Sequence, residues 1–183
     1  MNYQEYSPLA LRTLSPTFDG DNVSGDEFYK LIKGLSVSGE LITLFKRALF
    51  YGKPQEALTT PEGEKSLTSY FPHLNNPDKF NTLHALLGLI GESVELLQNL
   101  LGEDDSTNTV EEAGDLFWFM AVLTETNKLD VEVVWKANIA KLAARYPDKF
   151  DSDLSVNRDL EAEKVALETA LGNTDSQQLS LSL

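Results

Sequence analysis

The sequence has no cysteine and only two histidines, His73 and His84. Without cysteine the chain has no disulfide, no thiolate zinc site and no cysteine nucleophile. The two histidines are also not four positions apart on a helix, as the zinc site of a metalloprotease requires. Any metal that this protein binds is therefore expected to have oxygen ligands.

Basic residues are scarce: 15 Lys and Arg against 29 Asp and Glu give a formal net charge of −14 in 183 residues. Such a chain repels phosphate backbones and anionic lipid surfaces, so we expect neither nucleic acid nor a membrane as a partner. The sequence also lacks a basic segment followed by a long apolar core near its start, and its longest apolar runs, at 85–90 and 116–123, are too short to span a bilayer. We expect a cytoplasmic protein.

Prolines and glycines indicate where the segments of the chain begin and end. Residues 1–25 mix both with scattered apolar residues, which predicts an N-terminal arm. Residues 26–171 are predicted to form one helical domain, because their number is ordinary for a single domain. Within it, prolines and polar residues predict a loop or insertion at about 53–77. The polar segment 172–183 is expected to be a flexible tail.

Apolar residues recur at helical spacing along the domain, and no segment alternates as a strand does. The predicted helices cover 26–33, 38–50 and 158–171, with three longer ones that begin at Asp78, at Asn108 or Thr109, and at Asp130. The pattern from Thr109 to Glu112 is typical of a capping box. Short connections between long helices predict antiparallel neighbours, so the expected fold class is all-α, an antiparallel helical bundle.

The first two long helices are so apolar that the sequence predicts both to be buried, and acidic residues interrupt this apolar pattern. In the first, Glu92 and Glu95 are three positions apart on one face, which also carries His84. In the second, Glu112 and Asp115 repeat this spacing just before a strongly apolar segment. If these helices pack antiparallel, the four carboxylates face one another.

Four facing carboxylates need a cation, because burying like charges without one is costly. Mg²⁺ suits such a cluster, since it prefers carboxylate oxygens and keeps positions open for water and substrate phosphates. Mn²⁺ is an alternative ion with similar ligand preferences. The competing interpretation is a solvated acidic helix face, which is the commoner fate of glutamate. The apolar surroundings of both pairs favour a metal site and phosphate chemistry.

Candidate phosphate ligands occur on the third long helix and elsewhere. Asn138, Lys141 and Arg145 recur on one helical stripe, where an amide and two cations could hold phosphate. The helix dipole alone favours basic residues near a C-terminus, and this explains Arg145 better than the other two. Lys53, at a helix end, and His84 are further candidates, although an ordinary helix stop explains Lys53 equally well and a lone histidine more often has a structural role.

Over about residues 83–150 the chain resembles a known family, the MazG-like members of the all-α nucleoside triphosphate pyrophosphohydrolases. The resemblance lies in the segments LHALLGLIGESVELL, EEAGDLFWFM and NIAKLAARYPDKF. The family pattern E-x-x-E, a spacer and E-x-x-D corresponds here to the pairs Glu92 with Glu95 and Glu112 with Asp115. The chain has Gly91 where many relatives carry another acid, which leaves the number of metal ions open.

This resemblance implies a metal-dependent hydrolase that cleaves (d)NTPs between the α and β phosphates, giving the (d)NMP and pyrophosphate. It also implies Mg²⁺ bound by Glu92, Glu95, Glu112 and Asp115, with water activated by one of the first two. Relatives are usually dimers or tetramers, so the resemblance implies a homodimer or homotetramer that completes the bundle.

Two other hypotheses remain beside the hydrolase. One is a catalytically silent helical module that binds a nucleotide or a protein partner through the same groove. The other is a structural α-bundle whose acids only keep it soluble. Metal dependence separates them, because only the hydrolase needs both a divalent ion and all four carboxylates.

Overall fold

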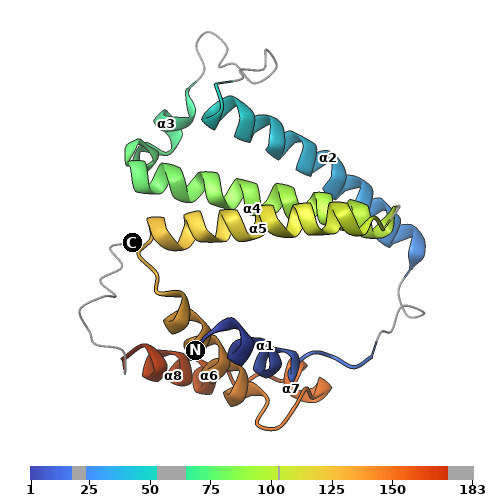
Figure 1. Ribbon diagram of the computed structural model, residues 1–183, viewed down its shortest axis with the longest axis vertical. Coiled ribbons are helices and arrows are strands. Elements are labelled where there is room, and N and C mark those ends of the chain that lie inside the picture. Colours follow the sequence, from blue (N-terminus) through green and yellow to red (C-terminus); the bar gives the residue numbers. More distant parts are fainter. Residues whose placement is uncertain (18–23, 53–64, 103, 173–183) are drawn as a thin grey trace. The chain divides into compact units, whose positions relative to one another are not determined.

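The computed structural model describes residues 1–17, 24–52, 65–102 and 104–172, and in these ranges every regular element is a helix (Figure 1). The predicted all-α fold class is therefore confirmed. The chain forms two compact units, Met1–Asn22 with Lys128–Leu183 and, separately, Val23–Asn127. None of the helices in the described ranges combines the length and apolar character needed to cross a bilayer.

The unit of residues 23–127 consists of helices that pack side by side. They are α2 (Gly25–Phe50), α3 (Leu67–Tyr70), η3 (Pro72–Asn75), α4 (Pro77–Leu101) and α5 (Ser106–Thr126). Thr82 near the start of α4 bonds Asn127 at the end of α5, whereas Asn99 near the end of α4 bonds Thr109 near the start of α5. The two helices are therefore antiparallel, as predicted, and α4 also packs against α2.

Two glycines allow close packing on both sides of α4. A Cβ atom on Gly88 would come within 2.3 Å of the Phe119 ring of α5, and one on Gly39 of α2 would come within 2.7 Å of Val94. Phe119 is buried, as is Ala85 on α4. Side chains larger than hydrogen at these two positions would push the helices apart, because a packed interior does not yield by that much.

The start of α5 differs from the prediction. The N-cap residue is Asp105, whose side chain accepts a hydrogen bond from the Thr107 N–H, so the predicted capping box at Thr109 is wrong. The side chain of Asn99, at the end of α4, bonds the Asp105 backbone and the Thr109 hydroxyl. A contact from the preceding helix therefore fixes the start of α5.

The predicted helices 26–33 and 38–50 form one continuous helix, α2, which begins at the N-cap residue Ser24. Ser38 does not cap a helix; its hydroxyl donates to the Gly34 carbonyl inside α2. A serine that bonds the carbonyl four positions earlier can stay within a helix.

The apolar faces of α4 and α5 are less buried than the sequence pattern predicts. Leu86 and Ile90 on α4, and Phe117 and Met120 on α5, are exposed, Phe117 by 68%. The pattern indicates an apolar surface correctly, but α2, α4 and α5 of one chain do not cover all of it.

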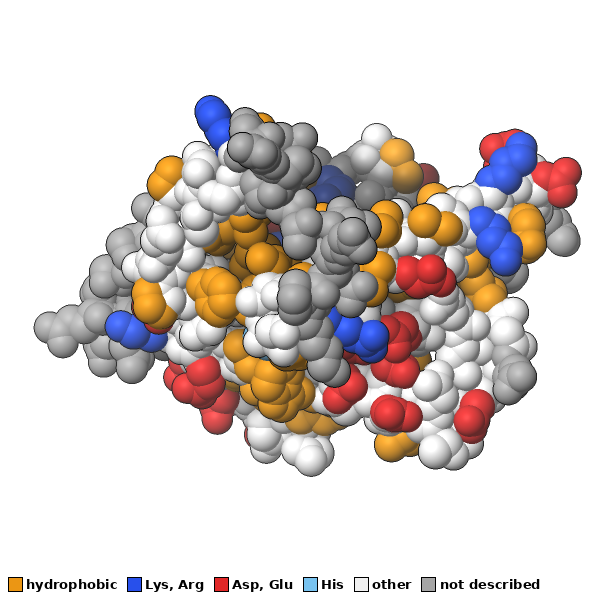
Figure 2. Space-filling model, turned by 90° about the horizontal axis from the view of Figure 1, so that it is seen from above, with side chains coloured by type: hydrophobic (Ala, Val, Ile, Leu, Met, Phe, Trp, Pro, Cys, Tyr) orange, Lys and Arg blue, Asp and Glu red, His pale blue; other side chains and the backbone are white. Residues whose placement is uncertain are grey.

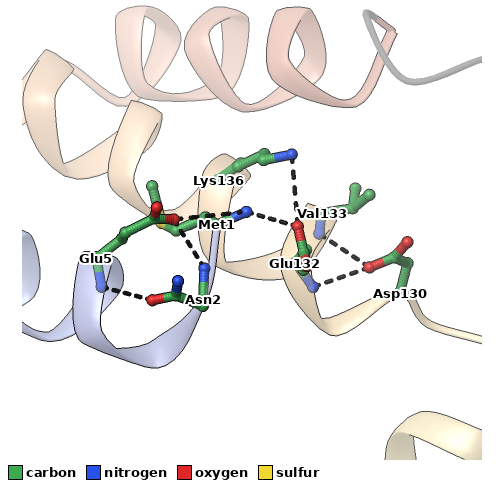
Figure 3. Close-up of polar contacts among 7 residues, drawn as sticks. All are labelled: Met1, Asn2, Glu5, Asp130, Glu132, Val133 and Lys136. Carbon is green, nitrogen blue, oxygen red and sulfur yellow. Dashed lines mark hydrogen bonds and ion pairs between the residues drawn. The ribbon is translucent and has the colours of Figure 1, made fainter.

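The other unit contains α1 (Tyr3–Leu11), α6 (Val131–Arg145), α7 (Ser152–Val156) and α8 (Leu160–Gly172). The expected N-terminal arm thus includes a helix, because Asn2 and Glu5 form a reciprocal capping box that offsets Pro8 within it (Figure 3). Tyr6 of α1 stacks on Trp135 of α6 with ring centroids 5.4 Å apart, which holds α1 against α6.

The predicted domain boundaries stay a prediction. The range 26–171 includes residues of both compact units. Of the expected loop at about 53–77, residues 53–64 lie outside the described residues, and the rest includes α3 and η3. Gly172 ends α8, and the remainder of the expected tail also lies outside the described residues.

A buried acid joins α6 to α8. Glu163 accepts paired hydrogen bonds from Arg145 and from Arg158, and these two cations hold its pKa well below the ordinary value of 4.5. The ionised Glu163 carboxylate therefore stabilises the fold fully above about pH 4.5, and this stabilisation is lost as the pH falls toward the lowered pKa.

We expect Glu163→Gln to lower the free energy of unfolding by about 2 kcal/mol at pH 7, since bonds to a charged acceptor are lost. The difference from the wild type should be smaller at about pH 3, because there the Glu163 carboxylate takes up a proton in the unfolded chain, whereas its lowered pKa keeps it ionised in the folded protein. Urea unfolding followed by circular dichroism at both pH values measures it. Glu161→Gln, on the exposed side of α8, is the control. A difference independent of pH would contradict this role.

Candidate functional site

Three carboxylates from two helices converge in the unit of residues 23–127. Glu92 lies on α4, and Glu112 and Asp115 lie on α5; one oxygen from each lies within 4.8 Å of the others. Glu92 and Glu112 are buried, whereas Asp115 is exposed. The antiparallel pairing of α4 and α5 produces this arrangement, because it brings two i, i+3 acidic pairs to the same level of the bundle.

A buried lysine from α2 takes part in the cluster. Lys46 Nζ lies 2.6 Å from Glu92 Oε1, and it also lies 4.8 Å from the centroid of the Phe119 ring. Lys46 and Glu92 are each 6% exposed. This ion pair compensates one of the buried negative charges.

Among the residues that the structure describes, none forms an ion pair with Glu112 as Lys46 does with Glu92. Its carboxylate accepts a hydrogen bond from Asn108 at 2.8 Å. Burial raises the pKa of Glu112, the Asn108 bond opposes this, and the charges of Glu95 and Glu92 raise it further. The site therefore stabilises a proton or another cation at this carboxylate.

The cluster lies in the wall of a cavity of about 450 Å³. Besides the three converging acids and Lys46, its lining includes Glu95, Glu111, Arg47, Tyr51 and Trp118. A second cavity of about 600 Å³ shares Glu95, Arg47 and Glu112 with it and is also lined by the amides Gln98, Asn99 and Asn108. Figure 2 shows a face of the molecule on which acidic side chains gather beside basic and hydrophobic ones.

Glu95, the fourth acid of the predicted set, is not among the three whose oxygens converge within 4.8 Å. It is exposed and lines both cavities. Partial burial raises its pKa, as does the charge of Glu92, while Lys46 and Arg47 lower it. Glu95 thus faces space that a ligand could enter.

The donor set fits a divalent cation. The converging groups are carboxylates alone, and two of them are held in place by Lys46 and Asn108. Carboxylate oxygens are hard ligands and suit Mg²⁺ or Mn²⁺. Zinc sites are instead commonly built from sulfur or imidazole ligands, which this cluster lacks.

His84 lies in an aromatic cluster next to this region. Its ring stacks on Phe50 at 4.1 Å and meets the Phe119 ring edge-on at 5.6 Å, and its Nε2 is 3.3 Å from the Tyr51 hydroxyl. Burial lowers the pKa of His84, and the charge of Lys46 lowers it further, so the imidazole is neutral at pH 7.

Three of the other predicted phosphate ligands are not part of the unit that carries the carboxylates. Asn138, Lys141 and Arg145 lie on α6 of the other unit. Asn138 accepts a hydrogen bond from the Tyr6 hydroxyl at 3.2 Å, and Arg145 is bound to Glu163. Lys53 lies outside the described residues.

Sequence reasoning missed Lys46 and Arg47. The apolar residues that recur at helical spacing in α2 include Leu41 and Phe45, yet both are exposed. The face that contacts α4 instead carries Gly39, Thr43, Lys46 and Phe50. These residues are three or four positions apart, which could have identified them as one face of the helix. Small and basic residues, however, are not typical of a buried face, so the sequence pattern did not predict one there.

The described part of residues 23–127 is thus all-α and carries a carboxylate cluster between two antiparallel helices. The family model described as MazG nucleotide pyrophosphohydrolase domain matches residues 80–150. By this match, residues 80–150 are similar to the MazG nucleotide pyrophosphohydrolase domain. Comparison with curated proteins gave no match, and neither did comparison with solved structures.

Proposed function

We propose that this protein is a metal-dependent nucleoside triphosphate pyrophosphohydrolase, which cleaves the bond between the α and β phosphates to give the (d)NMP and pyrophosphate. The observation that supports it best is the convergence of Glu92, Glu112 and Asp115 within 4.8 Å in the wall of a cavity. The residues that converge belong to a segment that matches the MazG domain.

Glu92, Glu112 and Asp115 would hold the Mg²⁺ ion, with Mn²⁺ as an alternative. When bound, the ion supplies charge neutralisation at the triphosphate oxygens and at the leaving pyrophosphate. Asn108 keeps the Glu112 carboxylate oriented through its hydrogen bond, and Lys46 does the same for Glu92.

Glu95 is the residue that we propose to orient and deprotonate the attacking water. Its carboxylate lines both cavities, and it is not one of the three acids that converge. A raised pKa makes it a better proton acceptor than an ordinary glutamate. Glu92 is less suited to this role because Lys46 already bonds its carboxylate.

Basic groups would bind the phosphates. Arg47 is exposed and lines both cavities, so it can contact an entering triphosphate. Asn138 and Lys141 on α6, and Lys53, remain candidates for phosphate or sugar contacts, as does His84. Arg145 is the weakest candidate, because Glu163 occupies its guanidinium.

We further propose that the chain acts as a homodimer or homotetramer. Large exposed apolar side chains on α4 and α5, among them Phe117 and Ile90, support this assembly. A second copy of the chain would remove them from water, as the interfaces of homo-oligomers do.

The test is a panel of ribo- and deoxyribonucleoside triphosphates incubated with the full chain and Mg²⁺, Mn²⁺ or chelator. We expect pyrophosphate together with the monophosphate, and no product in chelator. Orthophosphate with the diphosphate would contradict the proposed position of cleavage. If no nucleotide is cleaved but one raises the melting temperature, the silent binding module is the better hypothesis.

Replacing Glu95 tests whether this residue acts as the general base or as a metal ligand. We expect Glu95→Gln to lower kcat about 10²–10⁴-fold, the usual effect of losing a general base. Mn²⁺ affinity, followed by electron paramagnetic resonance, should stay within a few-fold of the wild type. Glu95→Asp, which keeps the carboxylate, should retain more activity than Glu95→Gln. Loss of Mn²⁺ binding in Glu95→Gln would instead make this residue a metal ligand.

A further inference from the structure

One basic side chain is built into the carboxylate cluster. Lys46 Nζ, from α2, lies 2.6 Å from Glu92 Oε1, and the two side chains are only 7% and 8% exposed. The Phe119 ring lies next to the same nitrogen, with its centroid 4.8 Å away. The ammonium group is therefore held between a carboxylate and an aromatic ring and has little access to water.

The packing of α2 on α4 leaves space for this ammonium group. A Cβ atom on Gly91 would lie 3.8 Å from Lys46 Nζ and 3.3 Å from Thr43 Oγ1. A longer side chain at position 91 would enter the region that the lysine occupies. Lys46 is thus positioned by the same glycine that precedes Glu92.

We propose that the Lys46 ammonium group takes the place of a second divalent cation at Glu92, so that this site binds a single divalent ion. The inference rests on the proposed function, since it presumes that the cluster binds a divalent ion at all. A carboxylate that bridges two metal ions gives one oxygen to each. At Glu92 the oxygen Oε1 already accepts the Lys46 hydrogen bond, so the other oxygen would remain to help Glu112 and Asp115 hold an ion.

Electrostatic repulsion also disfavours a second divalent ion at Glu92. A second divalent ion at Glu92 Oε1 would lie beside a buried ammonium group, where the repulsion between like charges is weakly screened. Lys46 cannot turn toward solvent without leaving its contacts with Glu92 and Phe119. It acts as a positioning residue, because it fixes Glu92 and limits the charge that the site accepts.

The experiment counts Mn²⁺ bound per chain by equilibrium dialysis, with electron paramagnetic resonance of the free ion. We expect one ion in the wild type and two in Lys46→Gln, which keeps a hydrogen-bond donor but has no charge. Lys46→Arg keeps the charge and should bind one. Lys33→Gln, the same change at an exposed position of α2, should also bind one.

Two ions in the wild type, or one ion in folded Lys46→Gln, would overturn the proposal. No ion in the wild type would instead contradict the proposed function, so the two failures are distinguishable. Circular dichroism checks folding, and Lys46→Met provides a second neutral variant of similar length. If neither neutral variant folds, the wild-type count still tests the proposal, because two ions bound beside the charged Lys46 would overturn it.

Discussion

Asp115→Asn is expected to reduce pyrophosphate release about 10³-fold or more while the protein stays folded. Asp115 is one of the three acids whose oxygens converge, and asparagine has the same size but no negative charge. Metal stabilisation of the charge that develops on the phosphates is worth several kcal/mol, and each 1.36 kcal/mol corresponds to about tenfold in rate. Because Asp115 is exposed, its replacement leaves no buried group without a partner.

The measurement compares kcat, Mn²⁺ affinity and the far-ultraviolet circular dichroism spectrum of the variant with those of the wild type. Glu125→Gln is the matched control, since it also neutralises an exposed acid of α5 but lies outside the cluster. We expect it to retain wild-type activity. Full activity of Asp115→Asn would refute the metal site, and an unfolded variant would favour the purely structural bundle.

Gly88→Ala is expected to destabilise the protein by about 1–3 kcal/mol, the usual effect of overpacking. The added Cβ would lie 2.3 Å from ring atoms of Phe119, which is buried between α4, Lys46 and His84. The ring cannot move away without disturbing these contacts. We therefore expect a fall in melting temperature of about 5–15 °C, given the size of the unit.

Gly114→Ala is the control, for which we expect a change in stability of the opposite sign. Gly114 lies within α5, and a Cβ there would meet no atom within 4 Å. Alanine favours a helix over glycine by about 1 kcal/mol, so this variant should be slightly more stable than the wild type. Thermal unfolding of both variants under one condition provides the comparison. If Gly88→Ala were as stable as Gly114→Ala, the close contact between α4 and Phe119 would be refuted.

Prediction from sequence succeeded where the signal is local and periodic. The helices at α4, α5, α6 and α8 follow from apolar residues at helical spacing, and Asp130 caps α6 as expected. Short connections predicted the antiparallel pair, and the pair brings Glu92, Glu112 and Asp115 together. These features depend on spacing within a helix and on loop length, both of which can be read directly from the chain.

Errors arose where a second helix decides the outcome. The capping pattern predicts the start of α5 at Asn108 or Thr109, but the helix begins at Ser106, and its N-cap residue Asp105 is bonded by Asn99 of α4. Propensity and capping patterns consider only neighbours in the chain, so a cap supported by another helix escapes them. For the same reason the exposed apolar residues of α4 and α5 were assigned to the interior, since periodicity identifies an apolar face but not what covers it.

The sequence by itself determined the all-α class, the acidic pairs with their spacing, and the oxygen-only character of any metal site, because composition and periodicity are properties of the chain alone. Tertiary structure alone decided which acids converge and which basic group joins them. Lys46 and Glu92 are far apart in the chain, and they meet only because glycines at positions 39, 88 and 91 allow α2, α4 and α5 to pack closely. Such a pair depends on the distance between helices, which no pattern within a single helix encodes.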